Sequence, residues 1–197
     1  MKQIQSIKQK KEISMRHLSI IFLIITFSLP AIAQEHEGQK EAATKLEAFQ
    51  SRSGFVMIRG YTTAGAIRGI RGNVTVDARD FRDASDPTRR VTGISISIKE
   101  TSRLESNISF IDYDEIEGLL KGIDYITRAD SEVTKLENFE VEYRTKGYFR
   151  VIVYNDSRGQ LSVALTSGRD GRTSAYLELE DLELFRKLIV AAKSYLE

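Results

Sequence analysis

Cysteine is absent from the 197-residue chain, and histidine occurs only twice. Without a thiol the chain can form no disulfide, no thiolate metal site and no cysteine nucleophile. The two histidines, His17 and His36, lie near the N-terminus, outside the segments with strand and helix patterns. The folded part therefore lacks the residue needed for a Ser-His-Asp triad or a histidine metal site. We expect no cofactor, no metal and no enzymatic activity.

Long apolar runs are also scarce, and the one near the N-terminus is short. Residues 18–29 are predominantly apolar, whereas a membrane-spanning helix needs roughly 20 apolar residues. Ala31 and Ala33 follow, at the two positions that a signal peptidase recognises. Basic residues precede the run: Lys8, Lys10 and Lys11, or Arg16 if translation starts at Met15. We predict that residues 1–33 are a cleaved signal peptide, that the mature protein is periplasmic or secreted, and that it keeps no membrane span.

Removal of residues 1–33 makes the chain slightly acidic. The leader holds five of the 29 basic residues and one of the 28 acidic ones, which leaves 24 and 27, a net charge of −3. The remaining 164 residues suit one domain with a hydrophobic core. A net charge near zero gives no long-range attraction to nucleic acid or anionic lipid.

Strand patterns dominate the first half of the mature chain. Residues 34–53 form a polar lead-in that favours a helix, with Ala42, Leu46 and Phe49 on one face. Strands are predicted at 55–61, 66–79, 94–98 and 108–111, with charged loops at 79–90 and 100–107. The clearest strand is 94–98, where isoleucine alternates with serine. A helix is predicted to begin near Asp112.

The second half repeats this order. Strands are predicted at 139–144, 149–153, 161–165 and 175–177, with turn residues at 155–159, a Gly-Arg loop at 168–172 and a helix that closes the chain. Adding 66 to four apolar positions of the first helix gives four apolar positions of the second. Ile116, Leu119, Ile123 and Ile126 thus correspond to Leu182, Phe185, Ile189 and Ala192. A four-stranded sheet with one helix buries one face well, so two copies could bury each other's remaining apolar surface.

We therefore predict an α+β fold of two ββββα repeats, in which each antiparallel sheet is followed by an amphipathic helix. Both repeats belong to one domain at 54–197, with halves at 54–128 and 138–197. This plan resembles the fold group of PC4-like, Whirly and PUR-repeat single-strand-binding proteins, with a local likeness over 148–197, where strands lead into the segment 174–182. The chain also resembles a family of uncharacterised exported bacterial proteins, at 112–116 and 138–140, and that likeness implies no known activity.

An acidic cluster at Asp112, Asp114 and Glu115 could be a carboxylate pair for acid–base or metal chemistry. Its spacing favours a capping box, with Asp112 as the N-cap and Glu115 three residues later. Glu178 and Asp181 occupy the corresponding places in the second half. We interpret the cluster as a helix start.

Four aspartates recur every three residues, at Asp77, Asp80, Asp83 and Asp86. Calcium loops of the EF type need oxygen ligands at alternate positions and a glycine at the bend. Two arginines interleave here, Arg79 and Arg82, and they would neutralise the site. We interpret this segment as a solvated strand end and loop.

Glycines are frequent between residues 60 and 72, at Gly60, Gly65, Gly69 and Gly72. No Gly-Lys-Ser/Thr follows them, so the segment is not a phosphate-binding loop. Glycines of this kind suit the bulges and tight bends of a curved sheet. The alternative is an anion site formed by Arg68 and Arg71.

Aromatic and basic residues mix in the second half, as in single-strand binders that stack bases and follow phosphates. They are Tyr143, Arg144, Lys146, Tyr148, Arg150, Tyr154, Arg169 and Arg172. Glutamates at 140, 142, 178, 180 and 183 share this half. The signal peptide and the negative net charge also argue against nucleic acid, so we interpret these residues as ordinary sheet packing with a solvated face.

Three functions remain open from the sequence. We expect an exported, non-catalytic binding or structural module whose partner is a protein or an envelope component. The alternative is a single-stranded nucleic-acid-binding protein of the PC4/PUR type. A second alternative is a hydrolase that uses carboxylates with Ser, Tyr or Lys, because such sites have no characteristic spacing.

Overall fold

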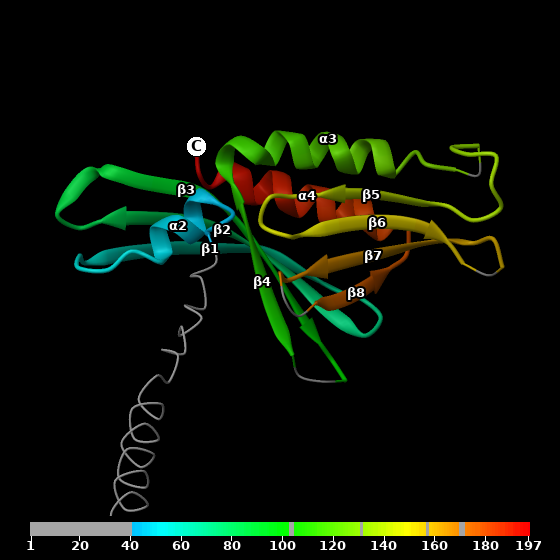
Figure 1. The fold of residues 1–197 in the computed structure, drawn as a ribbon, viewed down its shortest axis with the longest axis horizontal. Coiled ribbons are helices and arrows are strands. Elements are labelled where there is room, and N and C mark those ends of the chain that lie inside the picture. The colour runs from blue at the N-terminus through cyan, green and yellow to red at the C-terminus, as the bar shows by residue number, and fades with distance from the viewer. Residues whose placement is uncertain (1–40, 103–104, 131, 157, 170–171) are drawn as a thin grey trace, which may run out of the picture. The chain divides into compact units, whose positions relative to one another are not determined.

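Two four-stranded antiparallel sheets, each followed by a helix, make up the described part of the chain (Figure 1). The structure is a computed structural model and describes residues 41–197 except 103–104, 131, 157 and 170–171. The predicted signal peptide, with Ala31 and Ala33, lies outside the described residues. Within them, no helix is long and apolar enough to cross a membrane.

The first unit begins with a short helix and continues through four strands in sequential order. Its elements are α2 (Lys45–Gln50), β1 (Met57–Arg68), β2 (Gly72–Asp83), β3 (Asp86–Glu100), β4 (Ser106–Asp112), a 3₁₀ turn η1 (Tyr113–Glu115) and α3 (Ile116–Ile126). The second unit has the same order, with β5 (Glu140–Arg144), β6 (Arg150–Asn155), β7 (Leu161–Ser167), β8 (Thr173–Leu177) and α4 (Asp181–Ser194). The predicted α+β fold with repeated units is confirmed.

The strands of the first unit differ from the prediction at two places. The predicted strand over 66–79 is wrong, because the chain turns between Arg68 and Gly72. The predicted loop over 79–90 is also wrong, because β2 continues to Asp83 and β3 begins at Asp86. Charges in this hairpin pair within and between the strands, since Asp80 accepts hydrogen bonds from Arg82 of its own strand and from Arg90 of the neighbouring strand. Opposite charges on neighbouring strands stabilise a sheet, so a charged segment can remain in strand conformation.

Helix α2 belongs to the same compact unit as the two sheets, which spans residues 41–197. It begins at Lys45, where the Thr44 hydroxyl accepts a hydrogen bond from the Glu47 N–H at 3.1 Å. Leu46 and Phe49 are buried with Phe81 of β2 in a small second core. The apolar face predicted for the lead-in is therefore buried, in a helix of six residues.

Each long helix packs on the sheet of the other unit. Helix α3, from the first unit, contacts β5 and β6, whereas α4, from the second unit, contacts β1, β2 and β3 (Figure 1). The two helices are joined by the Arg186–Asp124 ion pair at 2.6 Å and the Lys193–Glu117 ion pair at 2.8 Å. The two units therefore complete each other's cores.

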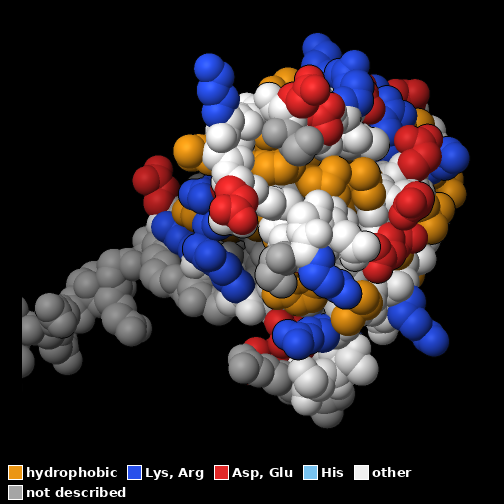
Figure 2. All heavy atoms as spheres, turned by 90° about the vertical axis from the view of Figure 1, so that its right-hand side faces the viewer, with side chains coloured by type: hydrophobic (Ala, Val, Ile, Leu, Met, Phe, Trp, Pro, Cys, Tyr) orange, Lys and Arg blue, Asp and Glu red, His pale blue; other side chains and the backbone are white. Residues whose placement is uncertain are grey.

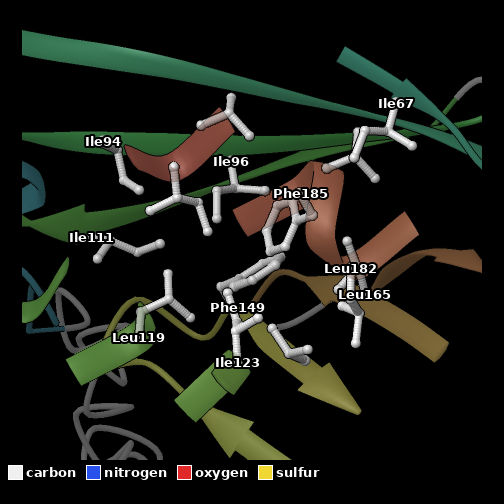
Figure 3. Packing of buried hydrophobic residues seen from close by; sticks show 14 of the residues in the cluster. Ile67, Ile94, Ile96, Ile111, Leu119, Ile123, Phe149, Leu165, Leu182 and Phe185 are labelled. Atoms are coloured by element: carbon white, nitrogen blue, oxygen red, sulfur yellow. The ribbon is translucent and has the colours of Figure 1, made fainter. Parts of the chain in front are cut away.

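The main core is one cluster that takes residues from both units. All eight helix positions related by the offset of 66 are at most 1 % exposed. Phe149, just before β6, packs against Phe185 of α4 with ring centroids 5.7 Å apart (Figure 3). The repeated apolar pattern thus marks residues that meet in a shared core.

Candidate functional site

The turn between β1 and β2 joins the two sheets. Ile70 exchanges two backbone hydrogen bonds with Tyr176 of β8, of 2.7 and 3.0 Å, and Figure 1 shows this turn beside β8. Gly69 and Gly72 flank the turn. A Cβ on Gly69 would lie 2.6 Å from the Tyr176 carbonyl oxygen, and one on Gly72 would lie 2.7 Å from that of Ser174. These glycines therefore permit the close approach of the two backbones, as predicted for a tight bend.

Arg71 holds an unusual backbone conformation in this turn. Its φ of 64° is left-handed, at a place where short hairpins usually carry glycine or asparagine. This conformation costs a residue with a side chain about 1 kcal/mol. Two contacts hold it, since the Thr101 N–H donates to the Arg71 carbonyl at 2.9 Å and the guanidinium lies 5.9 Å from the Tyr176 ring centroid. Strain maintained by its surroundings is typical of functional positions.

Two adjoining hollows open at this turn. The first, which we call the arginine cleft, has a volume of about 590 Å³ and is lined by Arg68, Gly69, Arg71, Asn73, Thr101 and Ser102. The second, which we call the Glu100 hollow, has a volume of about 390 Å³ and is lined by Arg71, Glu100, Ser102, Ser174 and Tyr176. Arg71 and Ser102 line both. Both volumes fall within the range of small-molecule sites, about 300–1,000 Å³.

The two arginines of the arginine cleft form no ion pair within the described residues. Arg68 and Arg71 are exposed, and neither side chain forms an ion pair or hydrogen bond with another described residue. Elsewhere arginines pair with carboxylates, as Arg79 does with Asp77 at 2.7 Å. Lys99 adds a third cation on the same face of the sheet, because it lies opposite Asn73, which lies opposite Arg68. An arginine fork matches a carboxylate or a phosphate, so this cleft can bind an anionic group.

The Glu100 hollow combines hydrogen-bond acceptors and donors. Glu100 is half-buried, and its Oε1 accepts a hydrogen bond from the Ser174 N–H at 2.9 Å. Its other carboxylate oxygen accepts no hydrogen bond from another described residue. Three residues that carry a hydroxyl group, Ser102, Ser174 and Tyr176, line the same hollow. A polar, neutral group with several hydroxyls suits this lining.

The acidic cluster near Asp112 is not a capping box. Asp112 accepts hydrogen bonds from the N–H groups of Lys45 and Leu46, at 2.8 and 3.1 Å, so it binds the start of α2. Neither η1 nor α3 has a side-chain cap, and Glu115 instead accepts from the Lys146 N–H at 2.8 Å. Asp112 does occupy the N-cap position of η1, as predicted, but the predicted capping hydrogen bonds are wrong. The start of α2 lies at the end of β4, and that contact between distant residues replaces the local one. Asp114 pairs with Lys45 at 2.8 Å.

The corresponding residues of the second unit form part of the predicted box. The Glu178 N–H donates to the Asp181 carboxylate at 3.2 Å, while α4 has no side-chain cap at its N-cap, Glu180. A capping box has two reciprocal hydrogen bonds, and the second unit therefore forms one of them.

The four recurring aspartates lie in the β2–β3 hairpin and bind their neighbours. Asp77 pairs with Arg79 and Asp80 with two arginines, while Asp83 and Asp86 accept hydrogen bonds from Ser85 and Thr88. Across the described residues, no group of three or more His, Cys, Asp or Glu is placed to hold a metal ion.

The aromatic and basic residues of the second half do not form one surface. Arg144 and Arg150 both pair with Glu142, at 2.8 and 3.3 Å. Tyr143 packs against α3, and burial raises the pKa of its hydroxyl. Arg169 lies over the Tyr148 ring, 5.1 Å from its centroid. On the face shown in Figure 2, acidic and basic side chains are interspersed, with hydrophobic ones between them.

Only part of the candidate site was predicted from the sequence. The alternative of an anion site named Arg68 and Arg71. No sequence pattern indicated that four further residues line the site: Glu100, Ser102, Ser174 and Tyr176. A stronger signal was present at Arg71, which stands at the end of a three-residue hairpin turn where glycine is usual.

No protein-family model matches this chain, and no curated protein and no solved structure shows significant similarity to it. Inference about function therefore depends on the chemistry of the two hollows.

Proposed function

We propose that the protein is an exported, non-catalytic binding module whose arginine cleft binds an anionic group of its partner. One observation carries this proposal. Arg68 and Arg71 line one cleft, and no carboxylate of the described residues pairs with either. Export is supported by the pattern of residues 1–33 alone.

The geometry favours binding by preorganisation. The hydrogen bonds of Ile70 with Tyr176, and of Arg71 with Thr101, fix the backbone that carries the guanidinium. A site whose backbone is already fixed loses less entropy when a ligand arrives. A hydrogen bond to a charged group contributes about 1.5–3 kcal/mol, so two guanidinium groups can support selective binding of a small anion.

The alternative of single-strand nucleic-acid binding has weaker support. It draws on the resemblance to PC4-like, Whirly and PUR-repeat proteins, which stays a prediction, and on the cations of the cleft. Against it, Arg144 and Arg150 are held by Glu142, and Arg158 is held by Asp156. A continuous track of free cations along a strand, with stacked aromatic rings, is what such binding requires.

Binding of inorganic phosphate and of acetate tests the proposal. Each anion is titrated into the full chain at low salt, and the backbone amide signals of Gly69, Asn73 and Ser102 are followed by NMR. We expect these signals to shift, and we expect Arg71→Ala and Arg68→Ala each to weaken binding about tenfold or more, which corresponds to the loss of one charge-assisted hydrogen bond.

Arg59→Ala is the matched control. Arg59 is an exposed arginine of the same strand as Arg68, and it also forms no ion pair with a described residue. Its loss removes the same charge without touching the cleft, so binding should not change. Equal weakening by all three variants would mean a general charge effect and would contradict the proposal. Tight oligonucleotide binding that falls steeply with salt would favour the nucleic-acid alternative.

A further inference from the structure

The two hollows at the β1–β2 turn differ in chemistry although they share a wall. The arginine cleft is lined by two arginines, whereas the Glu100 hollow is lined by Arg71, by a glutamate and by three residues that carry a hydroxyl group. Arg71 and Ser102 line both hollows. A ligand with a negative group beside a neutral part rich in hydroxyls would match both linings.

We infer that the ligand is an acidic sugar unit, with its carboxylate in the arginine cleft and its ring hydroxyls in the Glu100 hollow. This inference rests on the proposed binding of an anion by Arg68 and Arg71. It adds the substrate class and assigns a role to Glu100 as an acceptor for sugar hydroxyls.

Glu100 is placed to act in this way. The hydrogen bond from the Ser174 N–H to Oε1 fixes the carboxylate at the wall of the hollow, beside the edge strand β8. The second oxygen is left to accept from a ligand, since no other described residue donates to it. Sugar hydroxyls donate well to a carboxylate, and bonds to a charged acceptor are stronger than those between neutral groups.

Glu100 also selects against a chain of closely spaced negative charges. A ligand with a second anionic group next to the first would place that group in the Glu100 hollow, where like charges repel. A phosphodiester backbone repeats its charge at every nucleotide and is therefore disfavoured. A sugar unit with one carboxylate has a single negative group for the arginine cleft and neutral hydroxyls for the Glu100 hollow.

Three probes separate the contribution of the ligand's carboxylate from that of its hydroxyls. Glucuronate carries the carboxylate and the hydroxyls, acetate carries only the carboxylate, and glucose carries only the hydroxyls. Each is titrated into the full chain while the amide signals of Gly69, Ser102 and Ser174 are followed by NMR. We expect glucuronate to bind at least tenfold more tightly than either acetate or glucose, because it makes both sets of hydrogen bonds.

The outcomes distinguish this inference from the proposed function. If acetate binds as tightly as glucuronate, with dependence on Arg71, the anion site stands and the acidic sugar is overturned. If neither anion shifts the amide signals of the cleft, both the inference and the proposed function fall. If a single-stranded oligonucleotide binds more tightly than glucuronate, the ligand class is nucleic acid and the inference is wrong.

Glu100→Gln provides the sharper test. The amide oxygen can still accept from the Ser174 N–H, so the fold is preserved, but the charged acceptor is lost. We expect glucuronate binding to weaken about tenfold, while acetate binding is unchanged or tighter because a negative charge near Arg71 is gone. Glu105→Gln, at an exposed residue of the connection between β3 and β4, is the matched control and should affect neither probe. Equal weakening of acetate and glucuronate by Glu100→Gln would overturn the role of Glu100.

Discussion

Glu115 has a carboxylate group that is only half satisfied. Oε1 accepts from the Lys146 N–H, while Oε2 is buried and has no hydrogen-bond partner among the described residues. Burial raises the pKa of Glu115 above its ordinary value of 4.5, and the nearby carboxylates of Asp112 and Asp114 act in the same direction. The folded protein therefore holds this proton more tightly than the unfolded chain does.

This environment predicts a pH dependence of stability. A raised carboxyl pKa stabilises the fold fully below 4.5, and that contribution is lost as pH rises through the folded-state pKa. Glu115→Gln cannot ionise, so its stability relative to the wild type should increase as pH rises above 4.5, because only the wild type then has to charge a partly buried carboxyl group. Urea unfolding at several pH values measures the difference.

Glu117→Gln is the control for this measurement. Glu117 lies in the first turn of α3, two residues after Glu115, but the Lys193 ammonium lowers its pKa. Its stabilising contribution is therefore present at neutral pH and is lost as pH falls, the opposite dependence. Parallel stability curves for wild type and Glu115→Gln would contradict the assignment.

Single residues also show what the sequence can and cannot predict about the site. The arginines at 68 and 71 are neighbours along the chain, so their joint charge is visible in the sequence. Tyr176 and Glu100 reach the same place through the contact between β8 and the first sheet, which has no local signature. Asp112 has a strong local pattern for capping its own helix, yet its carboxylate binds the start of α2. Local spacing predicts a local role, and tertiary contacts can replace it.

At the scale of the element, α3 is shaped by the side chain it covers. Tyr143 of β5 lies against Gly118 and Gly122, and a Cβ on Gly122 would overlap the Tyr143 ring. Glycine inside a helix is about 0.5–1 kcal/mol less favourable than alanine. The two glycines therefore lower the helix propensity of α3, and they leave the space in which the Tyr143 ring packs.

The effect of Gly122→Ala should depend on Tyr143. In the wild type the added methyl collides with the ring, and such overpacking costs about 1–3 kcal/mol, so we expect a net loss of stability. In a Tyr143→Ala background the collision is absent, and the same change should stabilise by about 0.5–1 kcal/mol through helix propensity. Urea unfolding of the four proteins of this cycle measures both effects. The same sign in both backgrounds would show that the ring does not determine the choice of glycine.

Elements were predictable to different degrees. Period-two alternation identified the strand at 94–98, and the offset of 66 identified the buried positions of both helices, because burial on one face leaves a direct pattern. The charged segment 79–90 was predicted as a loop, because the pairing of β2 with β3, including the Arg90–Asp80 ion pair between the strands, does not appear as a local pattern. The pattern of an amphipathic helix shows which face is buried but not which sheet covers that face. The sequence therefore could not predict that α3 packs on the second sheet and α4 on the first.

At the scale of the whole described unit, this exchange makes the two repeats dependent on each other. Helix α3 covers the second sheet and α4 covers the first, and a single core includes residues of both. A unit without its partner would expose the face of its sheet that the other helix covers. Repeats of this kind gain stability from their interface more than from either copy alone.

We therefore expect one cooperative unfolding transition for residues 41–197. In a urea titration followed by NMR, amide signals of β2 and of β7 should disappear at the same denaturant concentration, because neither sheet keeps a closed core when the other unfolds. Phe149→Ala should lower the free energy of unfolding by about 3–5 kcal/mol, since the ring is fully buried against Phe185, and it should shift both sets of signals together. The fragments 54–128 and 138–197, each produced alone, should show no cooperative transition. If Phe149→Ala released the β7 signals at lower urea than the β2 signals, the halves would be separate folding units and the shared core would not be what holds them.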